Sequence, residues 1–167
     1  MDFAIRKARE GDLERIMDIY ALARKFQREH GNPTQWAGGY PAGELVRADL
    51  ERGELYVVCR ETSDGEEISG VFMFSREPEA DYEQIWDGSW QNDAPYGVVH
   101  RVASAGTSRG VGTACLAWAW EQCPNLRMDT HRDNEVMQRL LEKNGFRRCG
   151  LITGHDGKER IAYQKCL

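Results

Sequence analysis

The chain has 167 residues, of which 41% are hydrophobic and 29% charged, and its formal net charge is -5 at pH 7. A chain of this length can bury one hydrophobic core, so we expect a single domain spanning residues 1–167. The excess of acidic residues argues against nucleic acid as the main ligand, because nucleic-acid binding usually depends on a basic surface.

The composition also bears on compartment and metal binding. The sequence has no apolar run of the length that a membrane-spanning helix needs, which predicts that the chain does not cross a membrane. Its first residues lack the apolar stretch of a signal peptide. The five cysteines are an odd number and form no C-x-x-C pair, which argues against a disulfide framework or a structural zinc site. We therefore expect reduced thiols, a cytoplasmic location and no bound metal.

The N-terminal part of the chain alternates strand and helix patterns. Residues 3–8 alternate apolar and polar side chains, as a half-buried strand does. Apolar residues at helical spacing then predict an amphipathic helix over residues 12–28. The turn-rich residues 30–41 are expected to form a loop, and residues 42–53 a second short helix.

An acidic segment interrupts the pattern in the middle of the chain. Residues 76–95 hold six acidic residues, one basic residue and two tryptophans, and predict a mobile or partly helical connection. The other expected elements are a hairpin of strands 55–61 and 68–75, a strand at 96–104, a helix at 110–122, a strand at 125–130, a helix at 133–146 and a terminal hairpin. The order β-α-α-β-β-β-α-β-α-β-β predicts an α/β fold with a mixed, mostly antiparallel sheet and helices on both faces.

The stretch VASAGTSRGVGTACLAW, residues 102–118, passes from a strand through a glycine turn into a helix. Such a turn suits a phosphate, because the first helical turn has unbonded N–H groups and a partial positive charge. Gly110 and Gly112 would let a phosphate approach the backbone closely. A P-loop is excluded because no lysine follows either glycine, and Cys115 stands where a dinucleotide-binding turn needs its third small residue.

Two motifs resemble a known family when the turn is taken in another register. The segment TSRGVGTACL fits [Q/R]-x-x-G-x-[G/A], and DNEVMQRLLEKNGF fits N-x-x-A-x-x-[LF]-Y-x-x-x-G-F at Asn134, Leu140, Gly145 and Phe146. With the element order, these motifs resemble the GNAT superfamily of N-acetyltransferases over nearly the whole chain. The resemblance implies a GNAT fold whose sheet splays between its fourth and fifth strands, acetyl-CoA as cosubstrate and a primary amine as acceptor.

The resemblance also implies which residues hold the cofactor. The N–H groups of residues 108–113 would bind the CoA pyrophosphate, and the N–H of Val102 would hold the thioester oxygen. The full set of candidates is Arg101, Val102, Thr107, Ser108, Arg109, Gly110, Val111, Gly112, Thr113 and Asn134. Arg109 could equally be a surface side chain exposed to solvent, with no role in binding the cofactor. The sequence departs from the family at two positions: Thr107 replaces the usual Gln or Arg, and Leu141 replaces a frequent Tyr that protonates the leaving thiolate.

A base must take a proton from the acceptor, because an alkylamine with a pKa of about 10 is protonated at pH 7. His100 ranks first, since it lies two positions before Val102 and in a regular strand would share its face. Asp129 ranks second, because it matches a Glu that similar ribosomal-protein N-terminal acetyltransferases place on this strand. His131, at the end of the same strand, ranks third, and Tyr96 is a candidate acid. Each candidate base also has a purely structural alternative. His100 could be an interior histidine, Asp129 an anchor for a neighbouring arginine, and His131 a loop cap.

The acceptor site is expected to lie among aromatic and acidic side chains. Trp36, Tyr40, Trp86 and Trp90 would form its walls, and the acids of residues 76–95 would favour a cationic amine. Such an amine could be a polyamine, an amino sugar, or a lysine or N-terminal amine of a peptide. The alternative is that the acids are simply exposed to solvent and the tryptophans simply belong to the hydrophobic core. Rival functions are transfer of a longer acyl group or to an oxygen, non-catalytic or regulatory CoA binding, and a plain interaction domain. The sequence leaves open whether the chain forms a homodimer.

Overall fold

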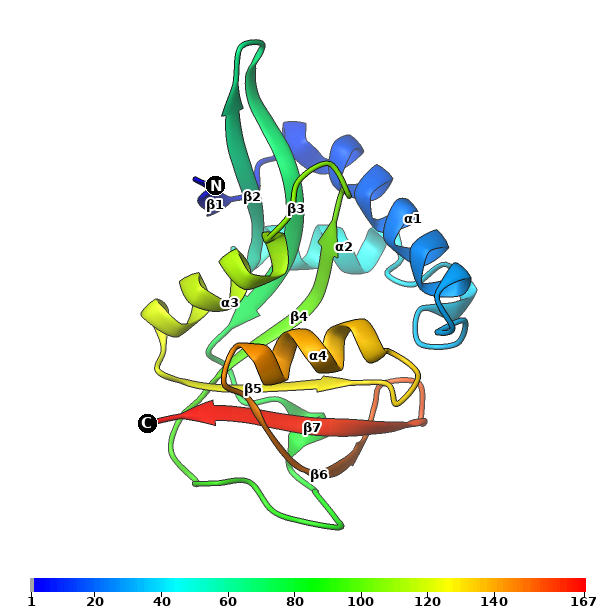
Figure 1. Cartoon of the computed structure of the whole chain (residues 1–167), viewed down its shortest axis with the longest axis vertical. Coiled ribbons are helices and arrows are strands. Elements are labelled where there is room, and N and C mark those ends of the chain that lie inside the picture. Colours follow the sequence, from blue (N-terminus) through cyan, green and yellow to red (C-terminus); the bar gives the residue numbers. More distant parts are fainter. Residues whose placement is uncertain (1) are drawn as a thin grey trace.

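The computed structural model describes residues 2–167, which form one open sheet flanked by helices (Figure 1). The strands are β1 (Ala4–Lys7), β2 (Leu55–Thr62), β3 (Gly65–Ser75), β4 (Gly97–Ser104), β5 (Asn125–Thr130), β6 (Arg147–Thr153) and β7 (Glu159–Cys166). The helices are α1 (Leu13–Glu29), α2 (Gly43–Glu51), α3 (Val111–Gln122) and α4 (Glu135–Lys143), with short 3-10 turns η1 (Glu10–Asp12), η2 (Ala37–Gly39) and η3 (Ala80–Tyr82). The predicted element order and mixed fold are confirmed. None of the helices in this part of the chain is both long and apolar enough to cross a membrane.

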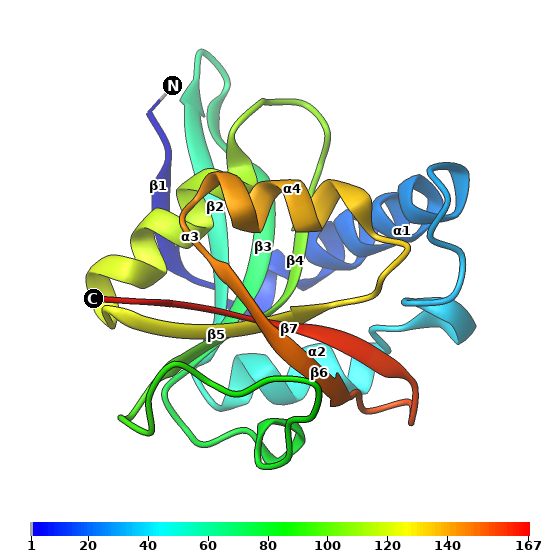
Figure 2. The same ribbon diagram turned by 60° about the horizontal axis from the view of Figure 1, so that its bottom comes forward.

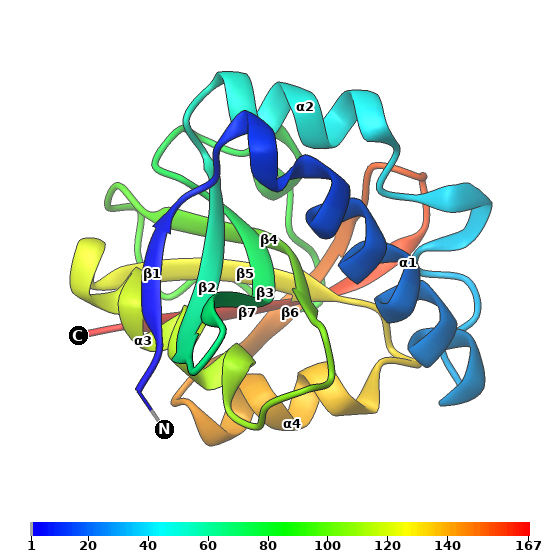
Figure 3. The same cartoon turned by 90° about the horizontal axis from the view of Figure 1, so that it is seen from above.

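The sheet runs β1-β2-β3-β4-β5-β7-β6, and its two faces are covered by different helices (Figure 3). Successive side chains of a strand point to opposite faces, and β3 follows this rule. Phe72 packs in the core beneath α3 and α4, whereas its neighbour Val71 packs in the core beneath α1 and α2. The expected helices on both faces are therefore confirmed.

The two central strands separate soon after they meet. β4 and β5 are parallel, and they pair only at Gly97 with Leu126 and at Val98 with Arg127. β4 continues along β3, while β5 pairs with β7 over its whole length. The predicted splay is confirmed, and it opens a gap between the two strands beyond Val98 (Figure 2).

A bulge in β4 changes which side chains share a face. Met73 of β3 pairs with His100 and Val71 pairs with Ala103, so β4 holds one extra residue between these pairs. Arg101 lies in this bulge with a left-handed backbone (φ 54°), and its carbonyl accepts a hydrogen bond from the Tyr20 hydroxyl at 2.9 Å. The expectation that His100 and Val102 share a face is wrong, because the extra residue reverses the alternation.

The acidic connection between β3 and β4 contains the short helical turn η3, which agrees with the partly helical form of the prediction. The connection is also tied to the sheet. Trp86 forms two backbone hydrogen bonds with Leu151 of β6, at 3.0 and 2.8 Å. The guanidinium of Arg127 lies between the rings of Trp90 and Tyr96, 4.3 and 4.1 Å from their centroids. These contacts hold the second half of the segment against β5 and β6.

Candidate active site

A large groove lies on the α3–α4 side of the gap. It has a volume of about 830 Å³ and runs from residues 102–106 of β4 and the following turn to the N-terminus of α3, between α1 and α4. Exposed apolar side chains border it at Leu22, Phe26 and Val136. Basic side chains also line it, namely those of Lys25, Arg139 and Lys143. The groove therefore suits a ligand with an apolar arm and an anionic end.

The glycine turn forms one end of this groove. Gly110 caps α3 with a left-handed backbone (φ 85°), which glycine adopts without strain. Gly112 lies against α4, since a Cβ there would come 2.6 Å from Cδ2 of Leu140. The first turn of α3 thus faces the groove with its N–H groups and partial positive charge, which favours an anion.

Most predicted cofactor residues lie along the groove, but three do not. Those that line it are Val102, Ser108, Gly110, Val111, Gly112, Thr113 and Asn134. Thr107 is exposed and donates to Glu67 at 3.3 Å, and Arg109 is exposed outside the lining. The side chain of Arg101 points to the other side of β4, so its position does not support the predicted contact with the cofactor.

A smaller polar cavity adjoins the groove. It has a volume of about 220 Å³ and shares four lining residues with the groove: Gln27, Val102, Asn134 and Met137. Its other walls come from the loop between α1 and α2, the ends of β4 and β5, the acidic connection and the β6–β7 turn. A ligand in the groove and a ligand in the polar cavity would therefore meet beside Val102.

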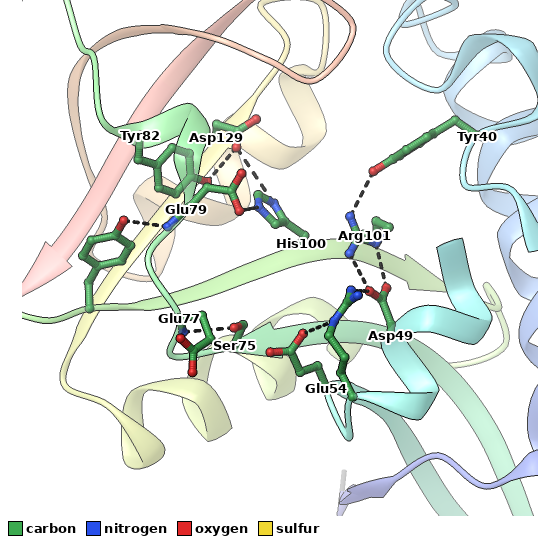
Figure 4. A network of polar contacts seen from close by, with 12 residues as sticks. Tyr40, Asp49, Glu54, Ser75, Glu77, Glu79, Tyr82, His100, Arg101 and Asp129 are labelled. Carbon is green, nitrogen blue, oxygen red and sulfur yellow. Dashed lines mark hydrogen bonds and ion pairs between the residues drawn. The ribbon is translucent and has the colours of Figure 1, made fainter. Parts of the chain in front are cut away.

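His100 occupies the polar cavity between two carboxylates (Figure 4). Its Nε2 lies 3.5 Å from Oε2 of Glu79, and its Nδ1 lies 3.9 Å from Oδ2 of Asp129. The hydroxyl of Tyr82, which is fully buried, donates to the same Asp129 oxygen at 2.6 Å. The structure thus brings the first- and second-ranked bases together, in a position to hold or move a proton.

The sequence did not single out Glu79 and Asp81, which complete this acidic cluster. The hydrogen bond to His100 lowers the pKa of Glu79. Burial, together with the nearby Glu79 and Asp129, raises the pKa of Asp81. They appear in the sequence only among the six acids of residues 76–95, and nothing in their spacing distinguishes them from the others.

Arg101 is held on the opposite side of the polar cavity by a buried carboxylate. Its Nε and Nη2 donate to Asp49 of α2 at 2.9 Å each, and its Nη1 donates to the Tyr40 hydroxyl at 3.0 Å. Asp49 is fully buried and also accepts from Arg52 at 2.9 Å. With Tyr20 bound to its carbonyl, Arg101 is fixed at both its backbone and its side chain.

Several predicted site residues lie outside both cavities. Nδ1 of His131 accepts from the N–H of Asp133 at 3.0 Å, which matches the loop-cap alternative, and burial lowers its pKa. The hydroxyl of Tyr96 accepts from the N–H of Glu79 at 2.9 Å, so it supports the cluster from behind.

The aromatic candidates for the acceptor site divide into two pairs. Trp36 and Tyr40 line the polar cavity, whereas Trp86 and Trp90 pack beside β6 and against Tyr82 and do not. Leu141, at the position of the family's tyrosine, is fully buried in the core under α4. In residues 2–167 no group of three or more His, Cys, Asp or Glu side chains is arranged to hold a metal ion.

Comparison with known proteins gives a consistent family. No family model and no curated protein sequence matches the chain, but many solved structures do. A GNAT-family acetyltransferase from Streptococcus agalactiae 2603 has a TM-score of 0.88 and 29% identity, covering 99% of this chain and 95% of that one. A GNAT-family acetyltransferase from Listeria monocytogenes 4b F2365 has a TM-score of 0.71 and 22% identity, covering 99% and 95%. A ribosomal-protein-alanine N-acetyltransferase from Brucella melitensis has a TM-score of 0.64 and 20% identity, covering 98% of this chain and 99% of that one.

The fold, the splayed strands and these likenesses define a transferase fold that serves acyl transfer. The chain therefore has the fold of the GNAT superfamily and is similar to acetyltransferases of that superfamily.

Proposed function

We propose that the protein is an N-acetyltransferase that transfers the acetyl group of acetyl-CoA to a primary amine within a ternary complex. The main support is the meeting of the large groove and the polar cavity at the gap between β4 and β5. This arrangement would bring a thioester in the groove against an amine in the cavity without a covalent enzyme intermediate.

The groove would hold acetyl-CoA. Its pyrophosphate would lie on the first turn of α3 near Gly110 and Gly112, where N–H groups and the helix dipole favour anions. The pantetheine arm would follow the edge of β4 that β5 leaves unpaired after Val98. Val102 has no partner in the register of either neighbouring strand, so its N–H is a suitable donor for the developing oxyanion.

His100 would act as the base. The acceptor would bind as an ammonium ion beside Glu79, Asp81 and Asp129 and give one proton to the imidazole. The amine nitrogen would then form a bond to the thioester carbonyl carbon, and the carbon–sulfur bond would break as the CoA thiolate leaves. Because a thiol has a pKa of about 8.5, the thiolate can leave without the tyrosine that Leu141 replaces. The nitrogen's second proton would pass to the thiolate or to water.

The charge of the polar cavity favours a cationic acceptor. Its guanidinium groups are already paired: Arg101 and Arg52 both lie 2.9 Å from Asp49, and Arg160 lies 2.8 Å from Asp156. Asp81 makes no ion pair with another described residue, and its raised pKa reflects crowding by like charges after burial. A substrate cation would relieve this repulsion.

A thiol-release assay tests the proposal, with acetyl-CoA and longer acyl-CoAs against cationic and neutral amines. We expect acetyl-CoA to raise the melting temperature, since a ligand bound only to the folded state stabilises it. Thiol release should require an amine and should be faster with cationic amines at low salt. Stabilisation by CoA without thiol release from any acyl-CoA and amine would favour the non-catalytic alternative. Equal turnover of neutral amines would contradict the cationic acceptor.

A further inference from the structure

Two loops far apart in the sequence meet over the polar cavity. The loop between α1 and α2 contributes Gln35, Trp36 and Tyr40 to its lining, and the β6–β7 turn contributes Gly154 and His155. In Figures 2 and 3 the β6–β7 turn reaches toward this loop at the end of the sheet opposite the C-terminus. The cavity is therefore bounded on this side by loops rather than by the sheet.

Tyr40 and His155 join the two loops. Their rings are stacked, with centroids 4.4 Å apart and planes inclined by 18°. The position of Tyr40 is also fixed from below, because its hydroxyl accepts from Arg101 at 3.0 Å, and from the side, where Trp36 meets it edge-on at 6.1 Å. The stacked pair therefore covers the cavity like a roof, and lining residues of the cavity, Arg101 and Trp36, hold Tyr40 in place.

The other end of the α1–α2 loop is tied to β5 and α4. Oε1 of Gln35 accepts from Nδ2 of Asn134 at 3.2 Å and from the N–H of His131 at 3.3 Å. The loop is thus attached on both sides of the cavity. The remaining side leads past Val102 into the groove, which acetyl-CoA would fill.

We infer that the acceptor is a small, polar primary amine rather than an amine of a peptide or protein, and that Tyr40 and His155 set this limit. The inference rests on the proposed function. A volume of about 220 Å³ lies below the roughly 300–1,000 Å³ of pockets for drug-sized ligands. It has room for about seven groups the size of water, at about 30 Å³ each. A peptide chain attached to the amine would need further space on the side that the stacked pair covers.

The test compares matched acceptors of two sizes in the thiol-release assay. One set holds single amino-acid amides and simple diamines, and the other holds five-residue peptides with the same terminal amine or a single free lysine amine. For the wild-type protein we expect kcat/KM at least 100-fold higher for the small set. His155→Ala removes half of the roof at an exposed position, so it should fold normally. It should raise kcat/KM for the peptides at least tenfold and change that for small amines only a few-fold.

His30→Ala is the matched control. His30 is exposed and stacks on Phe26 with centroids 3.8 Å apart and planes inclined by 17°, but it does not line the polar cavity. It should leave the ratio of small-amine to peptide turnover unchanged. Wild-type turnover of the peptides as fast as the small amines, or an unchanged ratio in His155→Ala, would overturn the inference alone. Turnover of neither set would overturn the proposed function and the inference with it.

Discussion

The groove and the polar cavity lie on either side of β4 but are built differently. The proposed anion-binding end of the groove comes from one continuous strand–turn–helix, and its proposed chemistry depends on backbone N–H groups and on the space that Gly110 and Gly112 leave. The polar cavity takes side chains from many separate parts of the chain and depends on charged groups that face one another. A site made by local backbone can be recognised from a motif, whereas one made by distant side chains cannot.

The difference also separates donor binding from proton transfer. Substitutions in the polar cavity should change turnover without changing acetyl-CoA affinity, and substitutions in the glycine turn should do the reverse. The following variants test this division.

The largest effect is expected for His100→Ala. General-base catalysis contributes about 10²–10⁴-fold, so kcat should fall by that amount while the Kd of acetyl-CoA stays within about twofold. Steady-state kinetics and a binding titration measure the two quantities. Asp129→Asn should give a smaller loss, because Asp129 touches His100 only at 3.9 Å. Unchanged kcat in His100→Ala would remove this residue from the mechanism.

Arg101→Gly tests whether the bulge in β4 positions the Val102 amide. Glycine adopts the left-handed backbone of this position freely, which removes a strain of about 1–2 kcal/mol, but it loses the bonds to Asp49 and Tyr40. Removal of an oxyanion donor costs about 10²–10³-fold in kcat, so misalignment should cost about 10–100-fold, with acetyl-CoA affinity nearly unchanged.

Asp12→Asn is the control for Arg101→Gly. It breaks another partly buried ion pair, with Arg6 at 2.8 Å, far from both cavities. It should lower the melting temperature and leave kcat unchanged. If Arg101→Gly behaves in the same way, the arginine has only a structural role.

The sequence predicted the fold correctly, and most of its cofactor candidates line the groove, whereas only Trp36 and Tyr40 of its four aromatic acceptor candidates line the polar cavity. The spacing of apolar residues and the positions of glycines predicted the helices and strands. The resemblance carried by the two motifs implied the splay of the sheet and the turn at Gly110. His100 was named for its position two residues before Val102, and Asp129 for its match to a Glu of similar enzymes, but the bulge at Arg101 has no signal in residue types. Asp49 looked like any acid of a short helix, and its burial follows only from the packing of α2 against β4. Trp86 and Trp90 were predicted as walls, yet Trp90 packs against Tyr82, and Trp86 is tied to β6 by its backbone with its side chain exposed.

Gly112→Ala tests the groove. The added methyl would lie 2.6 Å from Cδ2 of Leu140, so this side chain must move, and Leu140 lines the groove. We expect the Kd of acetyl-CoA to rise about tenfold, or about 1.4 kcal/mol, with kcat at saturation unchanged. Gly11→Ala is the matched control, because nothing lies within 4 Å of a Cβ there. Loss of kcat at saturating acetyl-CoA would show that the two sites are not separable in this way.

The smallest effects are expected for two neighbouring acids whose pKa values move in opposite directions. The pKa of Glu79 is lowered by its bond to His100, so its ionised form stabilises the fold above the pKa it has when unfolded, and this stability is lost as the pH falls. The pKa of Asp81 is raised by burial and by Glu79 and Asp129, so the native state holds its proton more tightly and stability falls as the pH rises through this window. At pH 7, Glu79→Gln should therefore lower the melting temperature and Asp81→Asn should raise it. Because both groups are partly solvated, we expect changes on the order of 1–2 °C.

Thermal unfolding at several pH values measures both variants. The difference for Asp81→Asn should shrink as the pH falls below the ordinary aspartate pKa of about 3.9, whereas that for Glu79→Gln should persist to lower pH, because the pKa of Glu79 is lowered in the folded state. Asp81→Asn should also raise KM for a cationic amine and leave the Kd of acetyl-CoA unchanged, because it removes a charge from the polar cavity alone. Equal signs for the two variants at pH 7 would mean that Asp81 is not crowded by its neighbours. The proposed preference for a cationic acceptor would then lose its support.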